Sequence, residues 1–224
     1  MLIRRPCVAR RFYRGDPKGL KKDVEGFLID RPKEKAVAVI APHAGYMYSG
    51  AVAGEVYSSV EVPDDIVLIG PNHTGMGKRI SVMSEGVWEV PTGKLNINSA
   101  LAGLILGASP LFSADIEAHM AEHSLEVQLP FIHELNRNAS IVPVTVMTAT
   151  ARECTEAGRA LAGALRSYGK EVLIVVSSDM NHYESDEETR VKDRAAIEAV
   201  LKLDSSGLLA VTSAKDISMC GVLP

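Results

Sequence analysis

Three short apolar runs of this chain each end at a cluster of polar residues. The runs and the clusters that follow them are Ala36–Ile40 before Ala-Pro-His43, Ile66–Ile69 before Gly-Pro-Asn-His73, and Val172–Val176 before Ser-Ser-Asp179-Met-Asn-His182. Short continuous apolar runs are typical of strands buried on both faces of a parallel sheet. Because ligands bind outside the carboxyl ends of the strands in open α/β sheets, we expect the chemistry of this protein at one edge of its sheet.

Segments with helical character alternate with these runs. Asp16, which precedes a proline, resembles a helix N-cap, and capping-box patterns at Thr150 and Ser185 predict two further helix starts. Residues 124–135 also have helical character, although Pro130 predicts a kink or a break there. The alternation of strand and helix predicts a single α/β domain over residues 1–224, with a mostly parallel or mixed central sheet and helices on both faces.

Charge and hydropathy exclude several kinds of partner. The 224 residues include 24 basic and 28 acidic ones, and the net charge of −4 gives no reason to expect nucleic acid or an anionic membrane as a partner. No apolar run approaches the roughly 20 residues that a membrane span needs. The arginine-rich start is not followed by the apolar region of a signal peptide, so the expected location is the cytoplasm.

The cysteines point to no structural cross-link. Cys7, Cys154 and Cys220 are odd in number and far apart, and no two of them form a C-x-x-C pair. Neither a disulfide framework nor a zinc ribbon is therefore indicated, and a reducing compartment fits this pattern.

His43 and His73 occupy similar positions shortly after two of the predicted strands. A single histidine is more often a hydrogen-bonding residue than a metal ligand, but two at the ends of strands expected to be neighbours can meet at one ion. Neutral imidazole suits iron, copper and zinc. On the third run, Asp179 and His182 are candidates for a further ligand or for a group that orients the ligands, although Asp179 could equally cap the turn after its strand.

A further histidine, His123, lies between carboxylates in Glu122-His-Ser-Leu-Glu126. A functional histidine here would act as an acid, a base or a hydrogen-bonding group for the substrate, with a pKa that a neighbouring carboxylate can raise. The alternative is an ordinary helix start whose polar residues face water. We assign His119 and His133 to that alternative.

Five motifs, in their order along nearly the whole chain, resemble those of the Memo family (mediator of ErbB2-driven cell motility). They are Ala41-Pro-His43-Ala-Gly-Tyr46-x-Tyr-Ser-Gly50, Gly70-Pro-Asn-His73, Glu122-His-Ser-Leu-Glu-Val-Gln-Leu-Pro130, Ser177-Ser-Asp179-x-x-His182 and Cys220-Gly221. The resemblance implies a fold like that of the class III extradiol dioxygenases, which hold non-haem Fe(II) on two histidines and a carboxylate. In the Memo family a cysteine stands in place of that carboxylate.

Carried over motif by motif, the resemblance assigns a role to each candidate residue. The implied metal ligands are His43, His73 and Cys220. The implied catalytic residues of the same pocket are His123, Asp179 and His182, and the implied substrate-pocket residues are Phe12, Tyr13 and Tyr46. The arginines on either side of Phe12-Tyr13 depart from the family pattern and predict a more basic pocket mouth.

A thiolate ligand leaves the metal and the reaction open. Because a thiolate is softer than a carboxylate, the site would favour copper or zinc while still admitting Fe(II). Iron or copper with open coordination positions would support redox or oxygen chemistry on a small-molecule substrate, whereas zinc would activate a water as in hydrolases. The resemblance also suggests a non-catalytic module that binds a phosphotyrosine peptide in the same pocket. The oligomeric state stays open.

The end of the chain is a further departure from the family pattern. Members of the family continue past the Cys-Gly motif with a helix and a strand, whereas this chain stops at Pro224. We therefore expect it to lack the family's final helix and strand, with a sheet edge exposed and Cys220 close to a free terminus.

Overall fold

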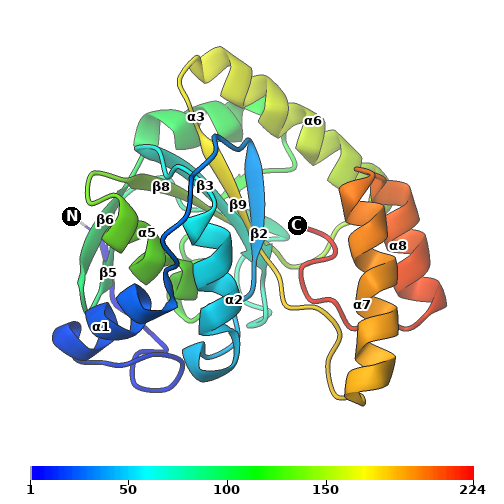
Figure 1. The fold of residues 1–224 in the computed structure, drawn as a ribbon. Helices are drawn as coiled ribbons and strands as arrows, with labels where there is room; N and C mark the ends of the chain where they lie inside the picture. Colours follow the sequence, from blue (N-terminus) through cyan, green and yellow to red (C-terminus); the bar gives the residue numbers. More distant parts are fainter. Residues whose placement is uncertain (1) are drawn as a thin grey trace.

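The computed structural model, which describes residues 2–224, has one central β-sheet between two layers of helices (Figure 1). Seven strands are hydrogen-bonded in the order β1-β5-β6-β8-β3-β9-β2. In that order they are Ile3–Arg4, Val87–Val90, Gly93–Ile97, Ser140–Val146, Asp65–Pro71, Leu173–Ser177 and Ala38–Ala41. Two short strands, β4 (Ile80–Val82) and β7 (Ser113–Ala114), extend the sheet beside β8. All pairs are parallel except β5–β6 and β4–β8, which confirms the predicted mostly parallel, mixed sheet.

Helices cover both faces of the sheet, as predicted. One face packs against α1 (Pro17–Phe27), α2 (Tyr46–Ser58) and α5 (Leu129–Leu135), and the other packs against α3 (Ser99–Ala108) and α6 (Ala151–Tyr168). A pair of helices, α7 (Asp186–Leu201) and α8 (Ser205–Ala214), lies to one side of the sheet in Figure 1. The short helix α4 (Glu117–Met120) precedes the segment that carries His123.

The predicted helix starts are confirmed. The side chains of Asp16, Thr150 and Ser185 accept hydrogen bonds from backbone N–H groups in the first turns of α1, α6 and α7, and Thr150 and Glu153 form a complete capping box. The segment around Pro130 is broken, because a 3-10 turn, η1 (Glu126–Gln128), gives way to α5 just before it. Proline is tolerated in the first turn of a helix, where its missing N–H would have no partner.

The strands that lead to His43 and His73 are not neighbours, so that expectation was wrong. Strand β9 lies between β2 and β3 and is parallel to both of them. Periodicity shows that a strand exists but carries no information about which strand pairs with it. Because the three strands are parallel, their carboxyl ends still meet at one edge.

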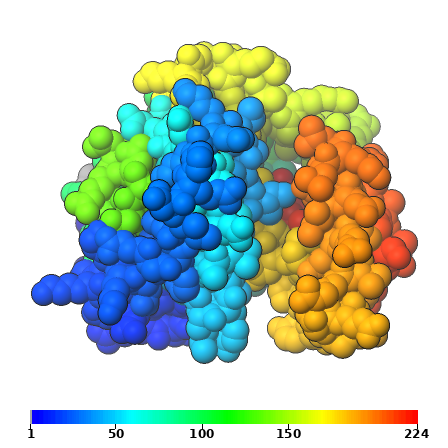
Figure 2. Space-filling view, in the orientation of Figure 1, coloured from blue at the N-terminus to red at the C-terminus, as the bar shows by residue number. Residues whose placement is uncertain are grey.

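The edge strand β2 is more exposed than β3, which lies in the interior of the sheet. Strand β3 is buried from Ile66 onward, whereas Val37, next to the edge strand β2, is 78% exposed. Between β2 and α7 the surface is hollowed, and the C-terminal residues are visible inside the hollow (Figure 2). A cavity of about 730 Å³ there is lined by α6, the α7–α8 pair, the β2–β9 edge and the C-terminal residues. Within residues 2–224, no helix has the length and apolar character that crossing a membrane requires.

Candidate metal centre

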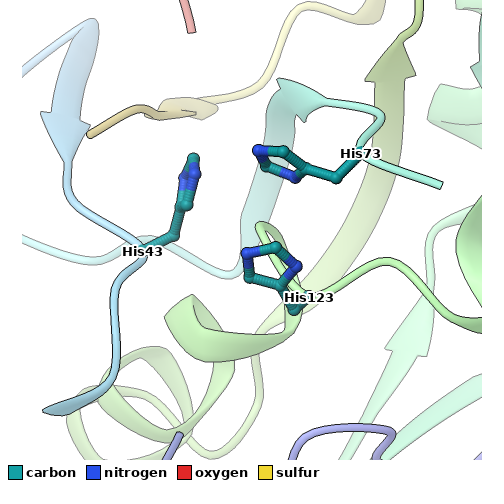
Figure 3. A group of neighbouring side chains, drawn as sticks. All are labelled: His43, His73 and His123. Carbon is teal, nitrogen blue, oxygen red and sulfur yellow. The ribbon is translucent and has the colours of Figure 1, made fainter. Parts of the chain in front are cut away.

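Three imidazole rings from separate parts of the chain converge at the carboxyl edge of the sheet (Figure 3). His43 follows β2, His73 follows β3, and His123 lies between α4 and η1. One ring nitrogen from each lies within 4.8 Å of the others. The ring centroids are 5.2 Å apart for His43 and His73, and 4.6 Å apart for His73 and His123. This spacing brings three potential ligand atoms around one point.

Hydrogen bonds orient the ring of His43. The Ser177 hydroxyl donates its only proton to the carbonyl oxygen of Ser124 at 2.6 Å, and its oxygen also accepts from the Gln128 amide at 2.9 Å. The His43 Nδ1 atom lies 2.8 Å from the same oxygen and must therefore donate to it. Nδ1 of His43 thus carries a proton, and Nε2 is the nitrogen that faces the site.

Glu122 has the same effect on the ring of His73 and lies close to that of His123. Its carboxylate lies 2.9 Å from Nδ1 of His73 and 3.4 Å from Nδ1 of His123, and it also accepts from the backbone N–H of His73. Because an ionised carboxylate can only accept, Nδ1 of His73 carries a proton, and Nε2 is the nitrogen that could bind a metal. A carboxylate that holds the distal nitrogen is the usual partner of a metal-bound histidine.

Cys220 supplies a sulfur donor beside the imidazoles. Its Sγ atom lies 3.1 Å from His43 Nε2 and accepts a hydrogen bond from the backbone N–H of Asp179 at 3.2 Å. Burial raises the pKa of the thiol, but hydrogen bonds with His43 and His73 lower it, and the result is a pKa of about 6. The close approach depends on Gly221, since a Cβ atom there would collide with the side chain of Ser178. Cys220 is therefore ready to bind a cation as a thiolate.

The protonation of the other residues follows from their contacts. Hydrogen bonds with Cys220 and Glu122 raise the pKa of His73 to about 10. Burial works against ionisation of Glu122, yet hydrogen bonds from His73 and from the backbone of Ser124 lower its pKa to about 2. Burial lowers the pKa of His123 to about 4, so this ring is neutral at physiological pH. A metal ion would take the place of the proton on His73.

Asp179 and His182 lie at the side of the centre. One carboxylate oxygen of Asp179 accepts from the backbone N–H of His43 at 2.7 Å, so this residue holds the turn after β2 and not that after its own strand, β9. The other oxygen lies 3.8 Å from His43 Nε2 and 3.9 Å from His182 Nε2. One oxygen of Asp179 therefore stabilises the turn, and the other faces the site. His182, which is about one-third exposed, lies on the outer side.

The three predicted substrate-pocket aromatics are in different environments. The ring of Phe12 lies 4.8 Å from the ring of His123 and flanks the site directly. Tyr13 and Tyr46 are instead buried in the core, where their hydroxyl groups donate to the Glu126 carboxylate and to the carbonyl oxygen of Val127. Of the three, only Phe12 contacts the imidazole cluster through its ring.

The segment from His119 to Glu126 does not follow the expectation that its polar residues face water. His119, Glu122 and Glu126 are all fully buried. Sequence reasoning therefore missed Glu122 and Ser177, the two residues that orient the rings. A signal for Glu122 was present, since it adjoins a histidine in a stretch rich in apolar residues. Ser177, in contrast, is simply the last residue of a strand.

Comparisons with known proteins agree with the arrangement of the motifs. The family model described as "Memo-like protein" matches residues 4–224. The chain is 43% identical to a "MEMO1 family protein" of Aquifex aeolicus, 41% identical to one of Pyrobaculum arsenaticum, and 39% identical to "MEMO1 family protein MTH_45" of Methanothermobacter thermautotrophicus. All of this chain is covered in these three comparisons, together with 84%, 84% and 85% of the relatives. The chain belongs to the Memo family.

Proposed function

We propose that this protein binds Fe(II) or copper through His43, His73 and Cys220 and carries out redox or oxygen chemistry on a small-molecule substrate, in the manner of class III extradiol dioxygenases. The observation that carries the proposal is the direction of the rings. Ser177 and Glu122 occupy Nδ1 of the two histidines, so that each presents Nε2 to the same space beside a thiol of low pKa. Such a set of nitrogen and sulfur donors fits a first-row transition metal.

The residues around the donors have the properties that catalysis needs. A bound iron or copper would supply the redox chemistry. His123 is neutral because burial lowers its pKa to about 4, so one ring nitrogen has a lone pair available to a substrate. Asp179 and His182 face each other at the outer side of the site and can hold or move a second proton. Phe12 provides an apolar wall next to His123, which suits an aromatic or apolar substrate.

The charge of the site argues for a cation over a phosphate. The carboxylates of Glu122 and Asp179 and the thiol of Cys220 all lie against the imidazoles. A phosphotyrosine dianion would be repelled by these groups, whereas a metal cation would be attracted. The phosphopeptide alternative predicts binding that survives removal of metal by a chelator. The proposed site predicts no such binding.

Zinc hydrolysis is a second candidate, and the third imidazole favours it. His43, His73 and His123 together form a set of three nitrogen donors, which is one of the ligand sets of catalytic zinc. In that case Cys220 and Asp179 would lie beside the metal and its bound water. The two candidates therefore differ in the metal and in whether His123 is a ligand or a base.

Activity with different metals distinguishes these candidates. The protein would be loaded without oxygen with Fe(II), copper or zinc. Oxygen uptake would then be measured with a panel of catechols, and hydrolysis with a panel of esters and phosphoesters. We expect oxygen uptake by the iron or copper form and its loss in His123→Gln with the metal retained. Hydrolysis by the zinc form alone would favour the second candidate, and inactivity of every loaded form would contradict both.

A further inference from the structure

Arg4 lies on the far side of the segment that carries Glu122 and His123. Arg4 is fully buried on β1, and its guanidinium lies 4.1 Å above the ring of Trp88. Each of its five N–H groups faces an acceptor, and these acceptors are the carbonyl oxygens of Arg5, His119 and Glu122, the sulfur of Cys7 and the carboxylate of Glu126. A guanidinium with every donor satisfied has one orientation, so it fixes the groups to which it donates.

Glu122 connects this arginine to the metal centre. Its carbonyl oxygen accepts from Arg4 Nη2 at 2.6 Å, while its carboxylate holds the Nδ1 atom of His73 at 2.9 Å on the opposite side. Arg4 Nε also donates to the carbonyl oxygen of His119 at 2.8 Å. The arginine therefore holds the backbone at both ends of the turn from residue 119 to residue 122. A shift in the backbone of Glu122 would move its carboxylate and so change the orientation of His73.

The partner of Arg4 serves the other side of the site. The Glu126 carboxylate neutralises the guanidinium and accepts from the backbone N–H groups of Cys7 and Val8 and from the Tyr13 hydroxyl. These contacts fasten the N-terminal segment in which Phe12 lies against His123. The buried pair is thus shared by the two chain segments that border the imidazoles.

We infer that Arg4 is a positioning residue of the metal centre and acts on His73 through Glu122. This inference rests on the proposed metal site. Loss of a group that orients a metal ligand typically weakens metal affinity by about 10- to 100-fold. Removal of Arg4 alone would leave Glu126 buried without its partner and could prevent folding, so the informative variant changes both residues. Arg4→Met/Glu126→Gln removes both charges and keeps much of the side-chain volume.

The test is Co²⁺ affinity, measured from the absorption of the bound ion, in wild type and three variants. Glu126→Gln keeps Arg4 and its bonds to the backbone, and Tyr168→Phe loses a hydrogen bond to Asp65 at the opposite end of β3. We expect at least tenfold weaker binding in Arg4→Met/Glu126→Gln, a smaller loss in Glu126→Gln, and affinity within twofold of wild type in Tyr168→Phe. Thermal unfolding of each variant shows whether it is folded. Twofold or smaller loss in the double variant, or equal loss in Glu126→Gln, would overturn the inference.

A second readout does not depend on the metal. Long-range ¹H–¹⁵N spectra of the metal-free protein report which nitrogen of each imidazole carries the proton. We expect the His73 signals to move in Arg4→Met/Glu126→Gln while those of His133, which lies beside Gly93 instead, stay in place. Unchanged His73 signals would reject the role of Arg4. If wild type bound no Co²⁺, the proposed function would fail, and these spectra would still decide the question of Arg4.

Discussion

The carboxylate of Glu122 lies 2.9 Å from Nδ1 of His73 and so leaves Nε2 of that ring to face His43 and Cys220. The same oxygen lies 3.4 Å from Nδ1 of His123. One buried side chain therefore sets the orientation of His73 and lies beside His123 as well. Because Nδ1 of His73 is held in this way, its Nε2 is the nitrogen that faces the other potential ligands.

Substitution Glu122→Gln should weaken metal binding about 10- to 100-fold, because an amide holds the imidazole N–H groups less firmly than a carboxylate does. Titration of the metal-free protein with Co²⁺ or Zn²⁺ measures the change. Glu117→Gln, at an exposed position on α4, is the matched control and should leave the affinity unchanged. Equal affinities of Glu122→Gln and wild type would show that the carboxylate does not support the metal.

The Cys220 thiol should ionise at a pH where the other cysteines do not. Its pKa is about 6, whereas burial raises the pKa of Cys7 to about 11 and also raises that of Cys154. In the metal-free protein, the thiolate absorbance near 240 nm should rise by one cysteine equivalent around pH 6. The step should vanish in Cys220→Ser and persist in Cys154→Ser. A first step above pH 8 would contradict the proposed contact with the imidazoles.

His119 should make the protein less stable as the pH falls. It is fully buried, neither ring nitrogen makes a hydrogen bond of ordinary geometry within residues 2–224, and burial lowers its pKa from 6.5 to about 4. Because the unfolded chain takes up this proton first, its contribution to stability is complete above pH 6.5 and is lost as the pH falls towards 4. His119→Leu should remove this loss of stability at low pH. It should also remove the cost of burying ring nitrogens without hydrogen bonds, which is about 1–3 kcal/mol.

Chemical denaturation of wild type and His119→Leu at pH 7.5 and pH 4.5 measures this effect. His123 has a similarly low pKa but is present in both proteins, so the difference between them reports His119 alone. The advantage of the variant should be larger at pH 4.5. An advantage that does not grow on acidification would mean that His119 binds its proton as readily in the folded state as in the unfolded one.

Local patterns in the sequence predicted the type of sheet, three helix starts and the edge at which the site lies. Apolar runs and helix caps are local signals, and each of the three strands that lead to the site lies where its run predicted. Strand order is a property of the whole chain, which is why β9 was not expected between β2 and β3. The break near Pro130 was predicted from a local signal, since proline lacks the N–H that a helix interior needs.

The support of the site was harder to predict than its ligands. His43 and His73 follow strands and could be recognised by position, whereas Cys220 was reached only through the family motif. Glu122 and Arg4 are charged residues that polarity alone would place at the surface, and both are fully buried. They are stable there because each has a partner, as Arg4 has in Glu126. These partners come from distant parts of the chain, and the local pattern of a sequence does not show such pairs.

Metal content tests the central claim most directly. Wild type, His43→Ala, His73→Ala and Cys220→Ser would each be offered Fe(II), copper and zinc without oxygen, freed of unbound metal, and analysed for metal per chain. We expect about one Fe(II) or copper ion per chain in wild type and a large loss of it in all three variants, which should remain folded. A wild type that retains no metal, or variants that retain as much as wild type, would contradict the His43, His73 and Cys220 site.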